Sequence, residues 1–186
     1  MASDVQKPYE MITDYATGRE IPDIGTETHR QAVEKYLHEQ LNYPLSSIGV
    51  DIELALSVAG EPYDAQLDLV ITVSDQPLMV IKCAAGSLES REKEVIAAAR
   101  IMGSLPVPYA VVSDGKTAVI YDALSRKKMA EGLDQLPSYE AAQEFIKTYA
   151  PAPIPEDRRE REKIIFKSYD SMNLNVQRFL KKAPLT

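Results

Sequence analysis

The chain has 186 residues, a formal net charge of -7, and 45% hydrophobic and 26% charged residues, which suits one compact core with extensions and excludes wholesale disorder. Its single cysteine, Cys83, excludes an internal disulfide, and no stretch approaches the ~18 apolar residues of a membrane span, so we expect a cytoplasmic protein. Nucleic-acid binders generally need a basic surface, so the negative charge argues against a strong autonomous DNA binder. The local basic clusters at 126–128 and 158–163 are interpreted as solvated surface.

Residues 1–25 mix polar residues, tyrosine and proline without clear periodicity, and we interpret them as an N-terminal arm. Thr26 is expected to cap a helix that ends before Pro44, because apolar residues follow it at helical spacing. From Ile48 to Val58 apolar and polar residues alternate, which predicts a strand with one face toward solvent.

Two apolar strands are predicted next, over 67–73 and 78–83, and each contains one charged residue. Asp68 lies in the first of them and Lys82 in the second. Ser87 then suits the cap of a helix over 88–102, in which early glutamates complement the positive end of the helix dipole.

Short strands over 109–112 and 117–121 flank an Asp-Gly pair, which is a strong hairpin signal. A helix opening at Pro137 and a long charged helix from Glu156 to about Leu180 follow, and we expect the last helix to pack as an appendage. The predicted organisation is therefore an arm over 1–25, an α/β domain over 26–136 and a C-terminal helical extension over 137–186.

Asp68 and Lys82 place an acid and a base inside neighbouring apolar strands, where an unpaired charge is unfavourable. Two interpretations stay open from the residues alone. In the first, Lys82 extends to solvent and Asp68 pairs with it or with Gln66. In the second, Asp68 and Lys82 are remnants of a metal site.

The segment from Thr26 to Asp134 carries a family resemblance in the runs THRQAVEKYL, NYP, QLDLVI, QPLMVIKCAAGS and AVVSDGKTAVIYD. This part of the chain resembles the N-terminal domain of type I restriction enzyme R subunits, a branch of the PD-(D/E)xK nuclease superfamily. The resemblance implies a restriction-endonuclease-like core of helix, three strands, helix and two strands. It also implies DNA as the substrate class and Mg²⁺ as the cofactor of an active enzyme.

Asp68 matches the family's metal-binding aspartate, but the Glu-x-Lys motif of the third strand fails. The family's apolar run aligns Lys82 with the glutamate and Ala84 with the lysine, and a shift of two places Val80 at the glutamate position. Because residues 80, 82 and 84 project to one strand face, that face has no acid in either alignment. A lysine where the metal would lie should abolish its affinity.

Three hypotheses follow. The first is a nuclease-like domain with lost or impaired cleavage and no cofactor, which acts as a DNA-binding or assembly module. The second is an active Mg²⁺-dependent endonuclease in which Asp68 binds the metal, Lys82 assists, and a relocated acid such as Glu53 replaces the missing glutamate. Further candidates for that place are Glu27, Glu34, Glu89 and Glu92. The third is an interaction module whose C-terminal helix recruits a partner protein or a second copy of the chain as a homodimer.

Overall fold

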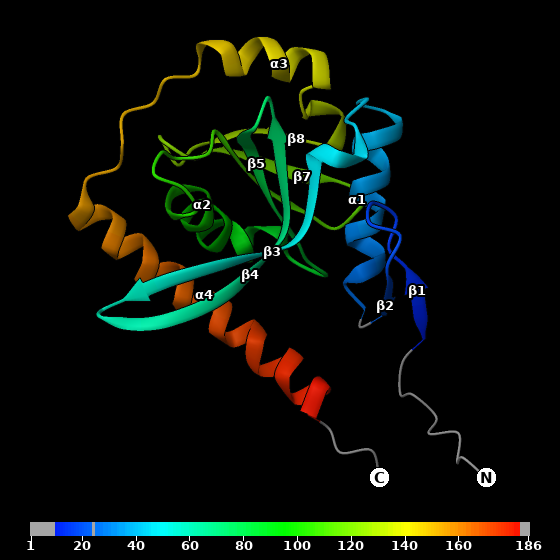
Figure 1. Ribbon diagram of the computed structural model, residues 1–186, viewed down its shortest axis with the longest axis horizontal. Helices are drawn as coiled ribbons and strands as arrows, with labels where there is room; N and C mark the ends of the chain where they lie inside the picture. Colours follow the sequence, from blue (N-terminus) through cyan, green and yellow to red (C-terminus); the bar gives the residue numbers. More distant parts are fainter. Residues whose placement is uncertain (1–9, 24, 183–186) are drawn as a thin grey trace.

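The computed structural model describes residues 10–23 and 25–182, with side chains as far as Met172. Its main element is a six-stranded sheet in the order β3-β4-β5-β6-β7-β8, in which β5 and β6 run parallel and the other neighbours antiparallel (Figure 1). The strands are β3 (Ile48–Val58), β4 (Glu61–Val73), β5 (Gln76–Cys83), β6 (Tyr109–Ser113), β7 (Ala118–Asp122) and β8 (Lys128–Glu131). In the N-terminal arm, β1 (Met11–Thr13) and β2 (Glu20–Pro22) form a separate hairpin.

Helices cover both faces of the sheet. The α-helices are α1 (Glu27–Glu39), α2 (Glu92–Ile101), α3 (Tyr139–Thr148) and α4 (Glu156–Lys182), and short 3-10 turns are η1 (Leu45–Ser47), η2 (Leu88–Arg91) and η3 (Leu133–Gln135). From α1 to β7 the order is one helix, three strands, a second helix and two strands, and α3 and α4 follow. This order confirms the predicted α/β core with a C-terminal helical extension. Within the described ranges, no helix is both long and apolar enough to cross a membrane.

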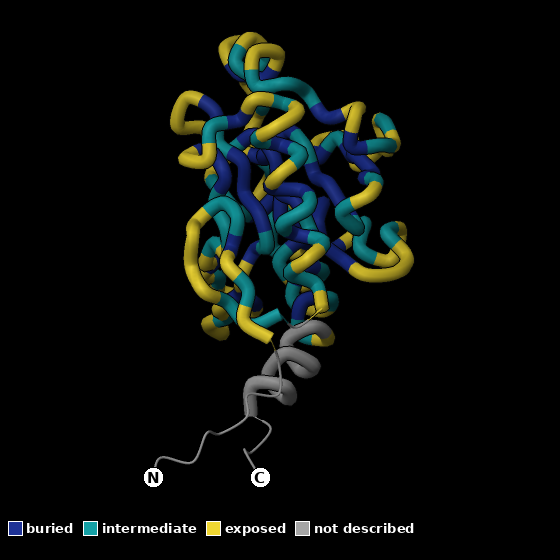
Figure 2. The backbone as a smooth tube through the Cα atoms, turned by 90° about the vertical axis from the view of Figure 1, so that its right-hand side faces the viewer, coloured by how far each residue is buried: buried dark blue, intermediate teal, exposed yellow. Residues whose placement is uncertain are grey.

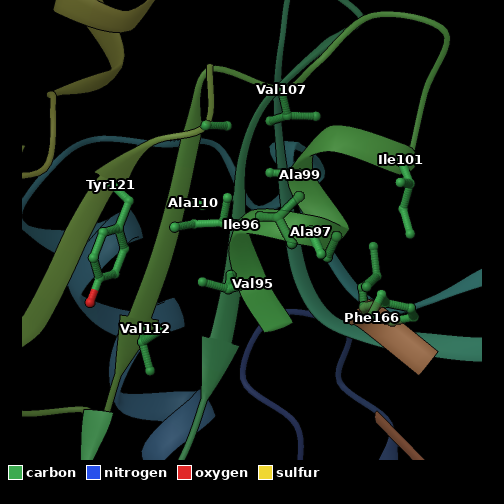
Figure 3. Close-up of a cluster of buried hydrophobic side chains, with 14 of the residues drawn as sticks. Val95, Ile96, Ala97, Ala99, Ile101, Val107, Ala110, Val112, Tyr121 and Phe166 are labelled. Atoms are coloured by element: carbon green, nitrogen blue, oxygen red, sulfur yellow. The ribbon is translucent and has the colours of Figure 1, made fainter. Parts of the chain in front are cut away.

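Two apolar cores lie on opposite sides of the sheet, because the side chains of its central strands alternate between them. On β5, Val80 packs with α2 and Phe166 of α4, whereas Ile81 and Cys83 pack with α1 and α3. Figure 2 shows the buried backbone concentrated in the middle of the molecule, and Figure 3 shows the core on the α2 side. The sheet therefore separates the two cores, and buried Cys83 packs in the core that includes α1 and α3.

The hairpin of β3 and β4 is longer than the sequence pattern predicted. Strand β4 begins at Glu61, because Ala59 and Gly60 make a tight turn with positive φ angles of 52° and 84°. The sequence pattern predicts this strand only over 67–73, but in its outer half exposed polar residues alternate with half-buried or buried ones. The hairpin extends outward past the rest of the sheet and lies across α4 (Figure 1).

Helix α4 is not the appendage that its charged sequence suggested. Phe166 is 1% exposed in the core against α2, and Asp170 accepts a 2.7 Å hydrogen bond from the hydroxyl of Tyr63 on β4. The Arg159 guanidinium donates to the carbonyls of Ile101 and Gly103 at the end of α2, both at 2.7 Å. The helix therefore closes the core by packing both α2 and the long hairpin.

Helix starts depart in detail from the predicted caps. Thr26 and Ser87 precede α1 and η2 as expected, but neither side chain makes a capping hydrogen bond. Ser138 does cap α3, accepting from the backbone N–H of Ala141. Strand β8 was missed, because its four residues are mostly exposed and carry no apolar alternation.

Candidate functional site

Asp68 and Lys82 lie side by side on the antiparallel strands β4 and β5, next to the pair of Leu69 and Ile81. Lys82 Nζ donates to Asp68 Oδ1 at 3.1 Å, and the backbone N–H of Cys83 donates to Asp68 Oδ2 at 2.7 Å. The predicted ion pair is thus present, but it is half-buried between the sheet and α2.

The face of β5 around Lys82 has no acid, as strand alternation predicted. Val80 and Ala84 belong to the core on the α2 side, and Lys82 lines a pocket on that same side. Neither alignment of the strand motif therefore brings a carboxylate from β5 to Asp68.

An acid does reach the site from another element, and it is one that sequence reasoning missed. Glu94, in the first turn of α2, is 1% exposed, with Oε1 3.4 Å from Lys82 Nζ and Oε2 3.4 Å from the Arg91 guanidinium. Residues 94–101 of α2 are all buried, so the helix is enclosed on every side. The uninterrupted apolar run after Glu94 was the available signal, since a helix apolar all round is buried together with the acid that opens its run.

The cluster of Asp68, Lys82, Arg91 and Glu94 balances two negative with two positive charges. Burial opposes the charged form of Lys82, but the nearby carboxylates of Asp68 and Glu94 outweigh it and raise the pKa of Lys82 above its ordinary value. The ammonium group therefore stays charged and bridges the two carboxylates.

A small pocket lies beside the cluster, between β4, β5, α2 and α4. Its free volume is about 10 Å³, which is room for one water molecule. The lining residues are Gln66, Leu67, Asp68, Val80, Ile81, Lys82, Glu94, Val95, Ala98 and Phe166. Phe166 comes from α4 and packs in the core beside α2 (Figure 3), and it also lines this pocket.

The donor atoms do not suit a divalent cation. All four carboxylate oxygens of Asp68 and Glu94 already contact a backbone N–H or a cationic nitrogen within 3.4 Å. Mg²⁺ prefers an octahedral shell of oxygens that includes several waters, for which a pocket of about 10 Å³ has no room. Among the described residues, no group of three His, Cys, Asp or Glu side chains could hold a metal.

The acids proposed from sequence as replacements lie elsewhere. Glu53 is exposed on β3 opposite Gln66, and Glu89 is exposed on η2. Glu92 is half-buried at the start of α2, near the ring of Tyr121. None of these three lines the pocket beside Lys82.

Glu27 and Glu34 belong to a second charged cluster that joins α1 to the N-terminal arm. The Arg30 guanidinium contacts Asp14 at 2.7 Å, Glu27 at 2.5 Å and Glu34 at 2.7 Å. Glu34 is fully buried and also accepts from the backbone N–H of Ala16 at 3.2 Å. The cluster holds the arm against α1.

Internal contacts engage several residues of the two basic clusters. Arg126 Nη1 lies 2.9 Å from Glu162, which also contacts Arg100 at 2.8 Å. Lys128 pairs with Glu131 at 2.6 Å, and Lys163 pairs with Glu160. These contacts pair three of the seven basic residues in the two clusters with carboxylates of the same chain.

The family of the type I restriction enzyme R protein N terminus (HSDR_N) matches residues 25–137. That segment includes the sheet, α1, α2 and the charged cluster at Asp68, and it ends before α3 and α4. No curated protein and no solved structure gives a significant match to the chain.

Proposed function

Because the chain belongs to the family of type I restriction enzyme R protein N termini, we propose that it is a non-cleaving form of that domain that serves as an assembly module. The observation that carries the proposal is the position of Lys82, whose ammonium group lies between Asp68 and Glu94. A bridging ammonium neutralises the carboxylates that a nuclease would use to hold Mg²⁺.

Helix α4 supports the same proposal. It lies outside the segment that matches the family, yet its residue Phe166 lines the pocket beside Asp68, Lys82 and Glu94. Phe166 therefore takes up space beside the carboxylates that a phosphodiester and its metal ion would need. The hydrogen bond of Asp170 to Tyr63 holds α4 in this position.

Assembly with a protein is favoured over DNA binding by the distribution of charge. The net charge is -7, and Arg126, Lys128 and Lys163 are engaged with carboxylates of the chain itself. Phosphate binding depends on available positive charge, so we expect no salt-dependent DNA shift at physiological ionic strength.

Incubation with supercoiled plasmid and Mg²⁺ or Mn²⁺ tests the absence of cleavage. We expect the wild-type chain to nick no more DNA than Asp68→Asn, because neither has a metal bound for water activation. Titration of the wild-type chain with Mn²⁺, followed by thermal unfolding, should leave the melting temperature unchanged.

The alternative is an active endonuclease in which Glu94 is the relocated acid, and its specific support is the 3.4 Å approach of Glu94 to Lys82. Cleavage that is lost in Asp68→Asn and in Glu94→Gln would contradict our proposal and establish this alternative. Glu53→Gln is the matched control, because Glu53 is exposed and lies outside the pocket. Its cleavage should equal that of the wild-type chain.

A further inference from the structure

The outer edge of β3 is the surface that points to a partner. Strand β3 is the first strand of the six-stranded sheet, with β4 as its one paired neighbour among the described strands. Its backbone groups on the other side form a row of donors and acceptors to which an extended chain can add as a further strand.

The hairpin geometry identifies the residues whose backbone points to that edge. Pro62 has no N–H, so its pair with Ser57 is one of the pairs without backbone hydrogen bonds. Such pairs alternate along an antiparallel ladder, so Ala55 and Glu53, which face Asp64 and Gln66, are of the same type. The N–H and C=O groups of Glu53, Ala55 and Ser57 therefore point away from β4.

The side chains of this edge are acidic. Glu53 and Asp64 are exposed and line a shallow hollow on the outer face of the hairpin, and Asp51 and Glu61 are also exposed. No lysine, arginine or histidine occurs between Ile48 and Ile81. The nearby Lys167 of α4 lies over the ring of Tyr63, whose side chain packs with the core on the opposite face of the hairpin.

We propose that the β3 edge of the hairpin binds an extended, lysine- or arginine-rich segment of a partner protein by strand addition. The exposed backbone supplies the hydrogen bonds, and the hollow between Glu53 and Asp64 takes a basic side chain of the added strand. This inference rests on the proposed assembly role, and it identifies the β3 edge as the surface through which the chain binds its partner. A second copy of the chain is disfavoured, because pairing of two β3 edges would bring rows of like charge together.

Binding of a fluorescent nine-residue peptide that alternates lysine and valine tests the inference, with a glutamate-valine peptide as its control. The full chain should bind the basic peptide in a saturable, salt-weakened manner and should not bind the acidic one. The double variant Glu53→Lys and Asp64→Lys should weaken binding by at least about tenfold, since attraction becomes repulsion. The variant Glu131→Lys with Glu144→Lys changes the net charge equally at other exposed sites and should bind as the wild-type chain does.

A separate variant tests the backbone hydrogen bonds of the β3 edge. Ala55→Pro removes an outward N–H and should abolish binding without breaking a bond to β4, while Ala55→Ser should bind normally. Amide NMR signals of Glu53, Ala55 and Ser57 should shift on binding, and those of β8 should not.

Equal binding by the charge-reversed variant or by Ala55→Pro would overturn the inference, as would dimerisation of the free chain through β3. These outcomes leave the plasmid result unchanged. Failure of the docking surface is thus distinguishable from failure of the non-cleaving role.

Discussion

Lys82 determines what the charged cluster can do. Its ammonium contacts Asp68 at 3.1 Å and Glu94 at 3.4 Å, and its side chain is 17% exposed. A carboxylate at this position would give three acids around one point, which is a cation site, whereas lysine gives a balanced ion cluster. The difference between a metal site and a structural cluster therefore depends on one residue.

Removal of the positive charge of Lys82 should destabilise the fold. Lys82→Met leaves the half-buried Asp68 and the buried Glu94 without their shared cation, and we expect the free energy of unfolding to fall by about 3 kcal/mol at pH 7. Urea unfolding measures the loss. Lys93→Met, at an exposed neighbour on α2, should change it by less than about 0.5 kcal/mol.

The double variant Lys82→Met with Asp68→Asn serves as the check on the cause. It should recover part of the lost stability, because one uncompensated charge is gone. A double variant no more stable than Lys82→Met alone would show that lost packing, not charge, explains the effect.

At the scale of elements, the core pattern and the C-terminal helices could be predicted, but strand β8 and the outer half of β4 could not. The alternation of β3 and the Asp-Gly turn at 114–115 are local signals, and both elements formed as expected. Strand β8 and the outer half of β4 carry polar residues, so their pairing is decided by neighbours that the sequence alone does not place. Glu94 was missed for the same reason, because its partner Lys82 lies on another element.

Helix α4 was predicted as a helix, and Phe166 is its one fully buried apolar side chain among the described residues. Phe166→Ala should lower the free energy of unfolding by about 3 kcal/mol, since Phe166 is 1% exposed in the core. The amides of α4 should then exchange with solvent faster than those of α1 in hydrogen-exchange measurements. Ile164→Ala is the control, because Ile164 is 51% exposed on the same helix. Equal exchange in both variants would mean that α4 is held by its polar contacts alone.

At the scale of the whole molecule, three ionic clusters join segments that lie far apart in the sequence. Arg30 holds the arm to α1, Lys82 joins the sheet to α2, and Glu162 of α4 joins Arg100 to Arg126. Each cluster is largely enclosed, so its charges are weakly screened and contribute to the pH dependence of folding. The cluster around Arg30 has more acids than bases, which makes it the most sensitive to protonation.

Burial raises the pKa of Glu34 to about 7 from its ordinary value of 4.5, and the charge of Asp14 acts in the same direction against that of Arg30. Between pH 4.5 and 7 the folded state therefore keeps a proton on Glu34 that the unfolded state has lost. The stability of the fold is thus highest, with respect to this group, below pH 4.5, and it falls as the pH rises to 7. Between pH 5 and 7.5 the free energy of unfolding of the wild-type chain should fall by on the order of 2 kcal/mol relative to that of Glu34→Gln, which cannot ionise.

Urea unfolding at a series of pH values measures this difference. The control is Glu144→Gln, at a side chain that is 70% exposed, and its stability should follow that of the wild-type chain at every pH. Parallel curves for Glu34→Gln and the wild-type chain would instead mean that Glu34 is ionised throughout and that Arg30 fully compensates its burial.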